Sequence, residues 1–206
     1  MKTTFSALLV FALAGSTISA TAEDWTGGYA GGSFGLSPFS SEQFEPYANF
    51  TVQGSGVVGG VYGGYLWSSS NLLFGIEADA HAGNLEDSTP TGPGGQDNFI
   101  TENWRASLRG VVGKDMGSYL LYGTAGAAAV NLDQQYRNPD STVANETLSG
   151  WTLGMGAKWL FKDDWETKVE YIYSDFGRGT FECSVCGPSE NDYKTHTVTV
   201  GFARRF

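Results

Sequence analysis

The chain has 206 residues, and its 12 lysines and arginines are outnumbered by 22 aspartates and glutamates, giving a formal net charge of −10. Aromatic residues make up 14% and charged residues only 17% of the chain, the reverse of the composition of a disordered protein. The acidic balance argues against nucleic-acid binding, which requires a basic surface for the phosphates. Beyond the first 22 residues, no apolar run approaches the roughly 20 residues of a membrane-spanning helix.

The N-terminal segment has the pattern of a secretory signal peptide. Lys2 supplies a positive charge, and Phe5–Ala14 is an apolar stretch too short to span a bilayer as a helix. Small residues at Ala20 and Ala22 predict cleavage before Glu23. A membrane anchor is the less favoured alternative, because it requires a longer apolar core. We therefore predict that residues 1–22 direct export and that residues 23–206 form one domain outside the cytoplasm.

The exported part of the chain predicts eight strands joined by connections of alternating length. Segments of about 10 residues with period-2 patterning recur between turn-forming residues. We expect strands at 25–36, 54–67, 72–82, 103–113, 119–132, 148–160, 165–176 and 194–206. The connections 68–71, 114–118 and 161–164 are short, whereas 37–53, 83–102, 133–147 and 177–193 are long. This sorting is typical of outer-membrane barrels, which have short periplasmic turns and long outer loops.

The alternation within the strands indicates which face meets lipid. In 165–176, Trp165, Val169 and Tyr171 alternate with Glu166 and Lys168. An eight-stranded barrel is too narrow to hold the bulky apolar set, so the polar set is expected inside. The segments 25–36, 54–67 and 119–132 are too rich in glycine and alanine for their faces to be assigned. The prediction is an all-β, eight-stranded antiparallel up-and-down transmembrane β-barrel.

Several segments resemble the porin-like small outer-membrane β-barrels of alphaproteobacteria, a group that includes opacity-type and OmpA-like barrels. The resemblance rests on Asp24–Gly32, Phe74–Asp79, Gly150–Gly156, Asp164–Gly177, His196–Phe202 and the terminal Arg205–Phe206. It implies location in the outer membrane of a Gram-negative cell and contact with outer-membrane lipid and lipopolysaccharide. It also implies that the barrel-assembly machinery reads the C-terminal Phe206. Gly28 and Arg204 depart from the family, which often has aromatic residues there.

The inward positions carry a set of opposite charges. These are Glu77, Asp79, Arg105, Arg109, Lys158, Glu166, Lys168, Glu170 and Arg205. Because consecutive strands form hairpins, we expect ion pairs between the strand of Glu77 and that of Arg109. The set is either an ion path or gate, or a polar plug that fills the lumen. The plug is favoured, because wide aqueous channels need larger barrels.

Most of the surplus negative charge falls in the four long connections. They contain Glu42, Glu45, Glu86, Asp87, Asp97, Asp133, Asp140, Glu146, Glu182, Glu190 and Asp192, against Arg137 and Arg178. This acidic surface is suited to recruiting divalent cations that bridge lipid phosphates, or to recognising another cell. The favoured interpretation is a solvated face that opposes aggregation.

Two cysteines, Cys183 and Cys186, lie in the last long connection. A C-x-x-C pair is found in redox domains and in zinc sites, but the chain has no βαβ context and no second cysteine pair. In an exported loop we expect a disulfide.

The sequence offers little for catalysis. Some eight-stranded outer-membrane barrels acylate or deacylate lipid A, and a deacylase of that type needs a histidine and a serine on the lipid face of one strand, with an acidic residue to orient the histidine. His81 is expected inside the barrel as a hydrogen-bonded polar residue, His196 is expected outside, and no nucleophile–base pair is recognised. The run Gly59–Gly64 lies within a strand, so it is not a phosphate-binding loop. We predict no catalytic residues, no cofactor and no metal.

The favoured function is that of a non-enzymatic outer-membrane barrel with a structural or surface-interaction role, an unidentified surface ligand and no nucleic-acid partner. A narrow channel for ions or small solutes is the main alternative. A lipid A-modifying enzyme and a soluble calycin-like barrel are less favoured.

Overall fold

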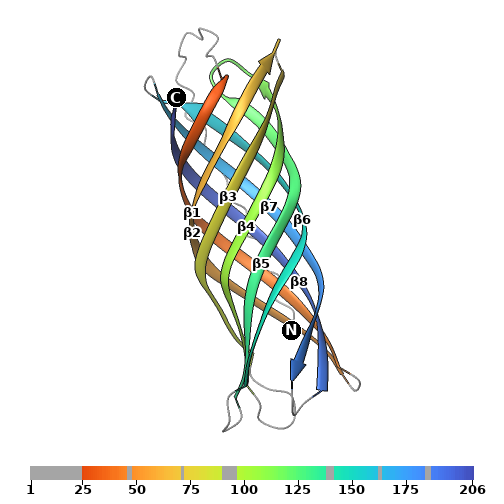
Figure 1. Cartoon of the computed structure of the whole chain (residues 1–206). Helices are drawn as coiled ribbons and strands as arrows, with labels where there is room; N and C mark the ends of the chain where they lie inside the picture. The colour runs from red at the N-terminus through yellow and green to blue at the C-terminus, as the bar shows by residue number, and fades with distance from the viewer. Residues whose placement is uncertain are drawn as a thin grey trace, which may run out of the picture.

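The computed structural model describes residues 25–45, 48–70, 72–89, 97–137, 142–161, 164–183 and 187–206. The strands are β1 (Gly27–Glu45), β2 (Ala48–Ser69), β3 (Leu72–Thr89), β4 (Asp97–Asp115), β5 (Leu120–Arg137), β6 (Thr142–Leu160), β7 (Trp165–Cys183) and β8 (Gly187–Arg205). Each pairs antiparallel with its neighbour in sequence, and β8 pairs with β1 to close a barrel of tilted strands (Figure 1). The predicted eight-stranded up-and-down barrel is confirmed. Over the described ranges, no helix is long and apolar enough to cross a membrane.

The short turns and the C-terminus lie at one end of the barrel. In the β4–β5 turn, Gly117 adopts a positive φ of 89° and its N–H donates to Asp115 Oδ1 at 2.7 Å. The closing strands meet at the same end, where Gly28 N donates to the Phe206 carbonyl at 3.1 Å and Phe206 N to the Gly28 carbonyl at 3.0 Å. The tight turns assign this end, which is at the top in Figure 1, to the periplasm.

The strands are longer than predicted. They run for 18 to 22 residues, whereas about 9–11 suffice to span a membrane. Most of each predicted long loop is therefore paired strand beyond the bilayer. Backbone hydrogen bonding between neighbouring strands does not require alternating apolar residues, so the pairing continues beyond the alternating segments. The apolar alternation marks only the stretch that faces lipid.

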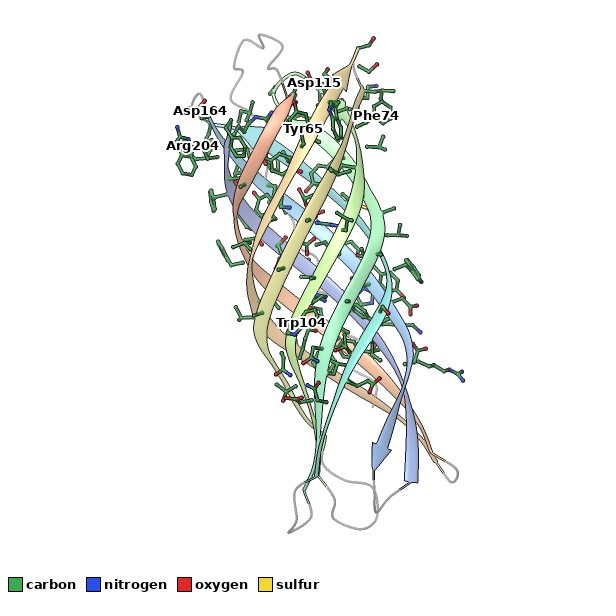
Figure 2. The ribbon with its side chains drawn as sticks, in the orientation of Figure 1. Tyr65, Phe74, Trp104, Asp115, Asp164 and Arg204 are labelled. Carbon is green, nitrogen blue, oxygen red and sulfur yellow. The ribbon has the colours of Figure 1, made fainter. Side chains whose placement is uncertain are left out.

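Apolar side chains cover the outside of the barrel. Leu36, Ile76 and Met155 are 61%, 53% and 66% exposed, and they occupy the outward positions of their strands. Aromatic residues bound this apolar band: Tyr65 and Phe74 lie near the turn end and Trp104 lies toward the opposite end (Figure 2). Such girdles mark the two membrane interfaces.

Two apolar clusters and a set of buried charged residues fill the lumen. An apolar cluster that includes Trp25, Leu66 and Leu120 occupies the periplasmic end. A second cluster that includes Phe39 and Phe176 lies toward the long connections. The ion pairs of Arg109 with Glu77 and Glu170 lie between the two clusters. Arg205 instead lies over the ring of Trp25 in the first cluster, and Glu102 is bonded to Tyr193 in the second.

Candidate functional site

All nine charged residues predicted for the lumen lie inside the barrel, each less than 9% exposed. Strands β3, β4, β6 and β7 contribute eight of them from alternating inward positions, and β8 contributes Arg205. The period-2 alternation of a strand places them there, because every second side chain points into the lumen.

Glu77 on β3 contacts the largest number of cations. Its carboxylate accepts hydrogen bonds from Arg109 at 2.7 Å and Lys168 at 2.9 Å, and it lies 3.4 Å from Lys158 Nζ. The Tyr29 hydroxyl also donates to it at 2.8 Å. This carboxylate therefore contacts side chains from four other strands.

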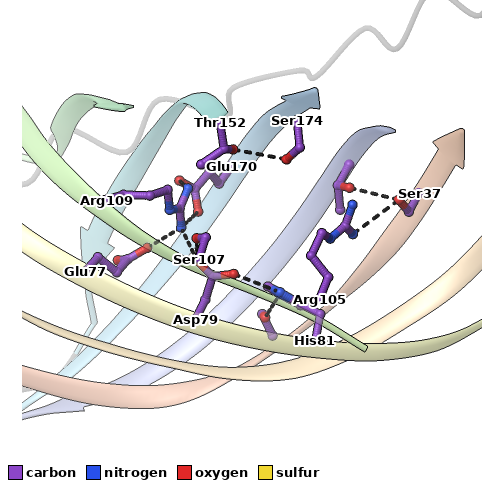
Figure 3. A network of polar contacts seen from close by, with 12 residues as sticks. Ser37, Glu77, Asp79, His81, Arg105, Ser107, Arg109, Thr152, Glu170 and Ser174 are labelled. Carbon is purple, nitrogen blue, oxygen red and sulfur yellow. Dashed lines mark hydrogen bonds and ion pairs between the residues drawn. The ribbon is translucent and has the colours of Figure 1, made fainter. Parts of the chain in front are cut away.

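Arg109 carries the network across the lumen from β3 to β7. Its guanidinium lies 3.1 Å from Asp79 and 2.6 Å from Glu170, in addition to its contact with Glu77 (Figure 3). A planar guanidinium with five N–H donors is suited to joining several carboxylates. Lys168 reinforces the link by contacting Glu170 at 3.0 Å.

Two smaller groups lie toward the ends of the barrel. Glu166 contacts Lys158 at 3.2 Å and Arg205 at 3.0 Å. At the other end, Arg105 donates to Thr195 and Ser37. Eight of the nine predicted residues thus belong to one connected network around Glu77 and Arg109, and Arg105 belongs to a separate group.

Sequence reasoning missed a buried acid, Glu102. It contacts Arg105 at 3.7 Å and accepts a hydrogen bond from Tyr193 at 2.9 Å. Glu102 was assigned to the end of a long connection, but the ladder extends through it. With Glu102 included, five acids face five bases and the lumen charges balance.

Two lumen tyrosines were also missed, because the faces of β1 and β2 could not be assigned. Lys158 Nζ lies 3.6 Å from the ring centroid of Tyr29, and Lys168 Nζ lies 3.7 Å from that of Tyr62. Both ammonium groups are therefore stabilised by ring faces as well as by carboxylates.

Inward glycines allow side chains on non-adjacent strands to meet. Gly64 on β2 pairs with both Tyr29 on β1 and Glu77 on β3. A Cβ at Gly64 would meet the Tyr29 hydroxyl at 2.6 Å. The position of Gly64 opposite the inward Glu77 is the signal that identifies Tyr29, its partner on the other side, as inward-facing.

The expectation that no nucleophile lies next to a histidine is wrong. Ser33 Oγ lies 3.0 Å from His81 Nε2, and His81 Nδ1 lies 3.1 Å from Asp79 Oδ1. The link passes over Gly60, which pairs with both Ser33 and His81. The pair was missed because the facing of β1 was not assigned.

This arrangement is enclosed. Ser33 and His81 are 7% and 5% exposed. The cavity beside Asp79, His81 and Arg105 has a volume of about 10 Å³, roughly the space for one water molecule. Ser33 does not line that cavity. The geometry matches a Ser–His–Asp arrangement whose hydroxyl and imidazole are both buried in the lumen.

Among the described residues, no group of three or more histidine, cysteine, aspartate or glutamate side chains is placed to hold a metal ion. His196 is exposed on the outer surface, as expected. Phe206 is 84% exposed, and its ring lies where a Cβ at Gly28 would come within 2.7 Å. The ring of Phe206 thus occupies the space that an aromatic side chain at position 28 would need.

Some predicted features lie outside the described residues or side chains. These are the segment 1–22, the side chains of Cys183 and Cys186, and most of the acidic side chains of the long connections. Asp133, Glu146 and Asp192 are the acids of that set whose side chains are described.

The sequence profile described as "Outer membrane protein beta-barrel domain" matches residues 5–206. The 31 kDa outer-membrane immunogenic protein of Brucella melitensis is 32% identical over 204 residues, covering 88% of this chain and 84% of that protein. The 22 kDa outer membrane protein of Rhizobium leguminosarum is 28% identical over 187 residues, covering 90% and 80%. The crystal structure of OprG from Pseudomonas aeruginosa matches with a TM-score of 0.59 at 14% identity, covering 88% and 96%, which shows a shared fold.

These matches extend over the same strands that form the closed barrel, and the relatives are outer-membrane proteins by name. Barrels of this kind contact membrane lipid through their outward face. The chain belongs to the outer membrane protein beta-barrel family and is located in the outer membrane.

Proposed function

We propose that this protein is a non-enzymatic outer-membrane barrel with a structural and surface-interaction role, and that its lumen is closed to steady flow. The observation that supports this is the ion-pair network centred on Glu77 and Arg109, which crosses the lumen between two apolar clusters. A buried charge without a partner costs several kcal/mol. Opening a path therefore requires several ion pairs to break together.

Planar-bilayer conductance of the purified protein tests this proposal, with a large porin as the positive control. We expect no steady current through the barrel. A steady current that scales with the number of inserted molecules would contradict the closed lumen.

A narrow channel is the second candidate. The polar cavity beside Asp79, His81 and Arg105 favours it, because water in that cavity would lie next to the charged network. A channel predicts that Glu77→Gln changes the cation-to-anion selectivity of the current. A closed lumen predicts no current whose selectivity could change.

The non-enzymatic part of the proposal is tested at Ser33. A fluorophosphonate probe labels activated serines, and we expect no labelling of the folded protein because Ser33 is buried. Labelling that disappears in Ser33→Ala but persists in the exposed-serine variant Ser69→Ala would instead indicate a serine hydrolase.

The proposal includes assembly and surface roles that follow from the family. We propose that residues 1–22 direct export, that the barrel-assembly machinery reads Phe206, and that Cys183 and Cys186 form a disulfide. The acidic outer connections form the surface presented to solvent or to another cell. Alkylation of the unreduced protein checks the disulfide, since two labelled cysteines would exclude it.

A further inference from the structure

A hollow lies on the outer surface of the barrel, away from the lumen network. It has a volume of about 470 Å³, and its lining includes Pro38 and Ser40 of β1, Ser55 of β2 and His196 of β8. We call it the rim hollow. Pro38 has no N–H to donate, and the β1–β8 pairing is interrupted between Leu36 and Phe39. Small side chains and this interruption leave the space open.

The rim hollow lies at the outer edge of the apolar band. On the same three strands, the next outward positions toward the membrane are Leu36, Val57 and Val198, which are 61%, 65% and 44% exposed. The hollow therefore adjoins lipid-facing surface on its periplasmic side and the long connections on its other side. This is the level of the headgroups of the outer leaflet.

The imidazole of His196 is held in a fixed orientation. Its Nδ1 lies 2.7 Å from the Tyr171 hydroxyl, and its ring centroid lies 5.0 Å from that of Tyr173. Tyr173 in turn packs against Trp151 at 5.3 Å. When the hydroxyl donates to Nδ1, the remaining nitrogen Nε2 carries the proton and is a donor for a ligand. The serine hydroxyls of the hollow add further donors.

A cation adjoins these donors. Lys194 pairs with Ser40 across the β1–β8 ladder, is 32% exposed and contacts Asp192 at 2.9 Å. An ammonium group has three N–H donors, and this contact uses one. Asp175 lies opposite Lys194, and Arg178 lies opposite Asp192. Two bases thus balance two acids, so the surface offers donors for a phosphate and acceptors for hydroxyl groups.

We propose that the rim hollow binds the phosphorylated sugar headgroup of an outer-leaflet glycolipid. The phosphate is held by Lys194, His196 and the serine hydroxyls, the sugar hydroxyls donate to the neighbouring carboxylates, and an acyl chain lies along Leu36, Val57 and Val198. At this site the barrel would recognise one class of lipid headgroup, in addition to the non-specific contact of its apolar surface with lipid chains. This recognition does not depend on whether the lumen conducts.

Native mass spectrometry of the purified full chain in detergent, titrated with lipid A and with dephosphorylated lipid A, tests the proposal. We expect lipid A to bind more tightly than its dephosphorylated form. The double variant Lys194→Gln, His196→Phe is expected to lose about tenfold in lipid A affinity, as for the loss of a hydrogen bond to a charged group. Arg204→Gln is the matched control, since Arg204 is exposed on the same face of β8 at the opposite membrane boundary.

A second variant keeps the test independent of the His196 contacts. Ser55→Trp fills the hollow from β2 and leaves the Tyr171–His196 contact in place, and we expect the same loss of affinity. Unheated gel mobility confirms that each variant is folded. Equal affinity for the two lipids, or an equal loss in Arg204→Gln, would overturn the proposal and indicate only non-specific attraction of an anionic lipid.

Discussion

At the scale of single residues, Glu77 shows how a charge becomes stable inside a barrel. It is fully buried, yet two lysines, one arginine and one tyrosine hydroxyl surround its carboxylate. Its replacement leaves those cations without their shared partner. A surface ion pair has no comparable importance, because water and salt screen it.

Glu77→Gln is therefore expected to lower the free energy of unfolding by about 3–5 kcal/mol, the usual cost of breaking a buried ion pair. Urea unfolding in detergent, followed by tryptophan fluorescence, measures the change. Asp164→Asn is the matched control, because Asp164 and Arg204 lie 3.7 Å apart with side chains 59% and 66% exposed. We expect less than about 1 kcal/mol for that variant. Similar losses in the two variants would show that the lumen network is not what stabilises the barrel.

At the scale of strands, glycine positions determine which lumen side chains meet. On β2, Gly60 faces inward between Ser33 and His81, whereas its neighbour Gly59 faces outward. A Cβ at Gly60 would lie 2.2 Å from the Ala80 carbonyl oxygen and 2.6 Å from the His81 ring, but one at Gly59 would have 3.9 Å to the nearest atom, a backbone oxygen. The two positions thus differ in side-chain space and not in strand propensity.

Gly60→Ala is expected to destabilise the barrel by about 1–3 kcal/mol through overpacking, and Gly59→Ala is expected to be close to neutral. Urea midpoints of the two variants under identical conditions compare them directly. If Gly59→Ala proved as costly as Gly60→Ala, the effect would come from the backbone of β2 and not from the lumen contacts.

At the scale of the whole molecule, stability depends on closure. The β1–β8 ladder joins the two ends of the chain, so no strand edge faces lipid, where unpaired backbone groups are costly. The outward surface provides little cohesion of its own, because Phe34, Leu36 and Val61 are all more than half exposed.

We expect the folded protein to migrate differently in unheated and heated gel samples, because a closed barrel resists detergent unfolding. A variant lacking residues 187–206 loses β8 and both of its ladders, and it should show no shifted band. A shift that persists without β8 would mean that the compact species is not the closed barrel.

The sequence by itself determined the number of strands, their antiparallel order and the lipid-facing sides of β3, β4, β6, β7 and β8. It could do so because a lipid-facing strand must alternate apolar and polar residues. It also identified nine of the ten buried acids and bases among the described residues, because every second side chain of a strand points into the lumen.

Only the tertiary structure decided the facing of β1, β2 and β5, where glycine and alanine obscure the alternation. Tyr29, Tyr62 and Ser33 were missed for that reason. The strand extensions and Glu102 were missed because pairing beyond the membrane needs no apolar pattern. The partners of each charge depend on the register and curvature of the closed barrel. These bring Lys168 of β7 to Glu77 of β3 across the lumen, although the two residues are 91 positions apart in the chain.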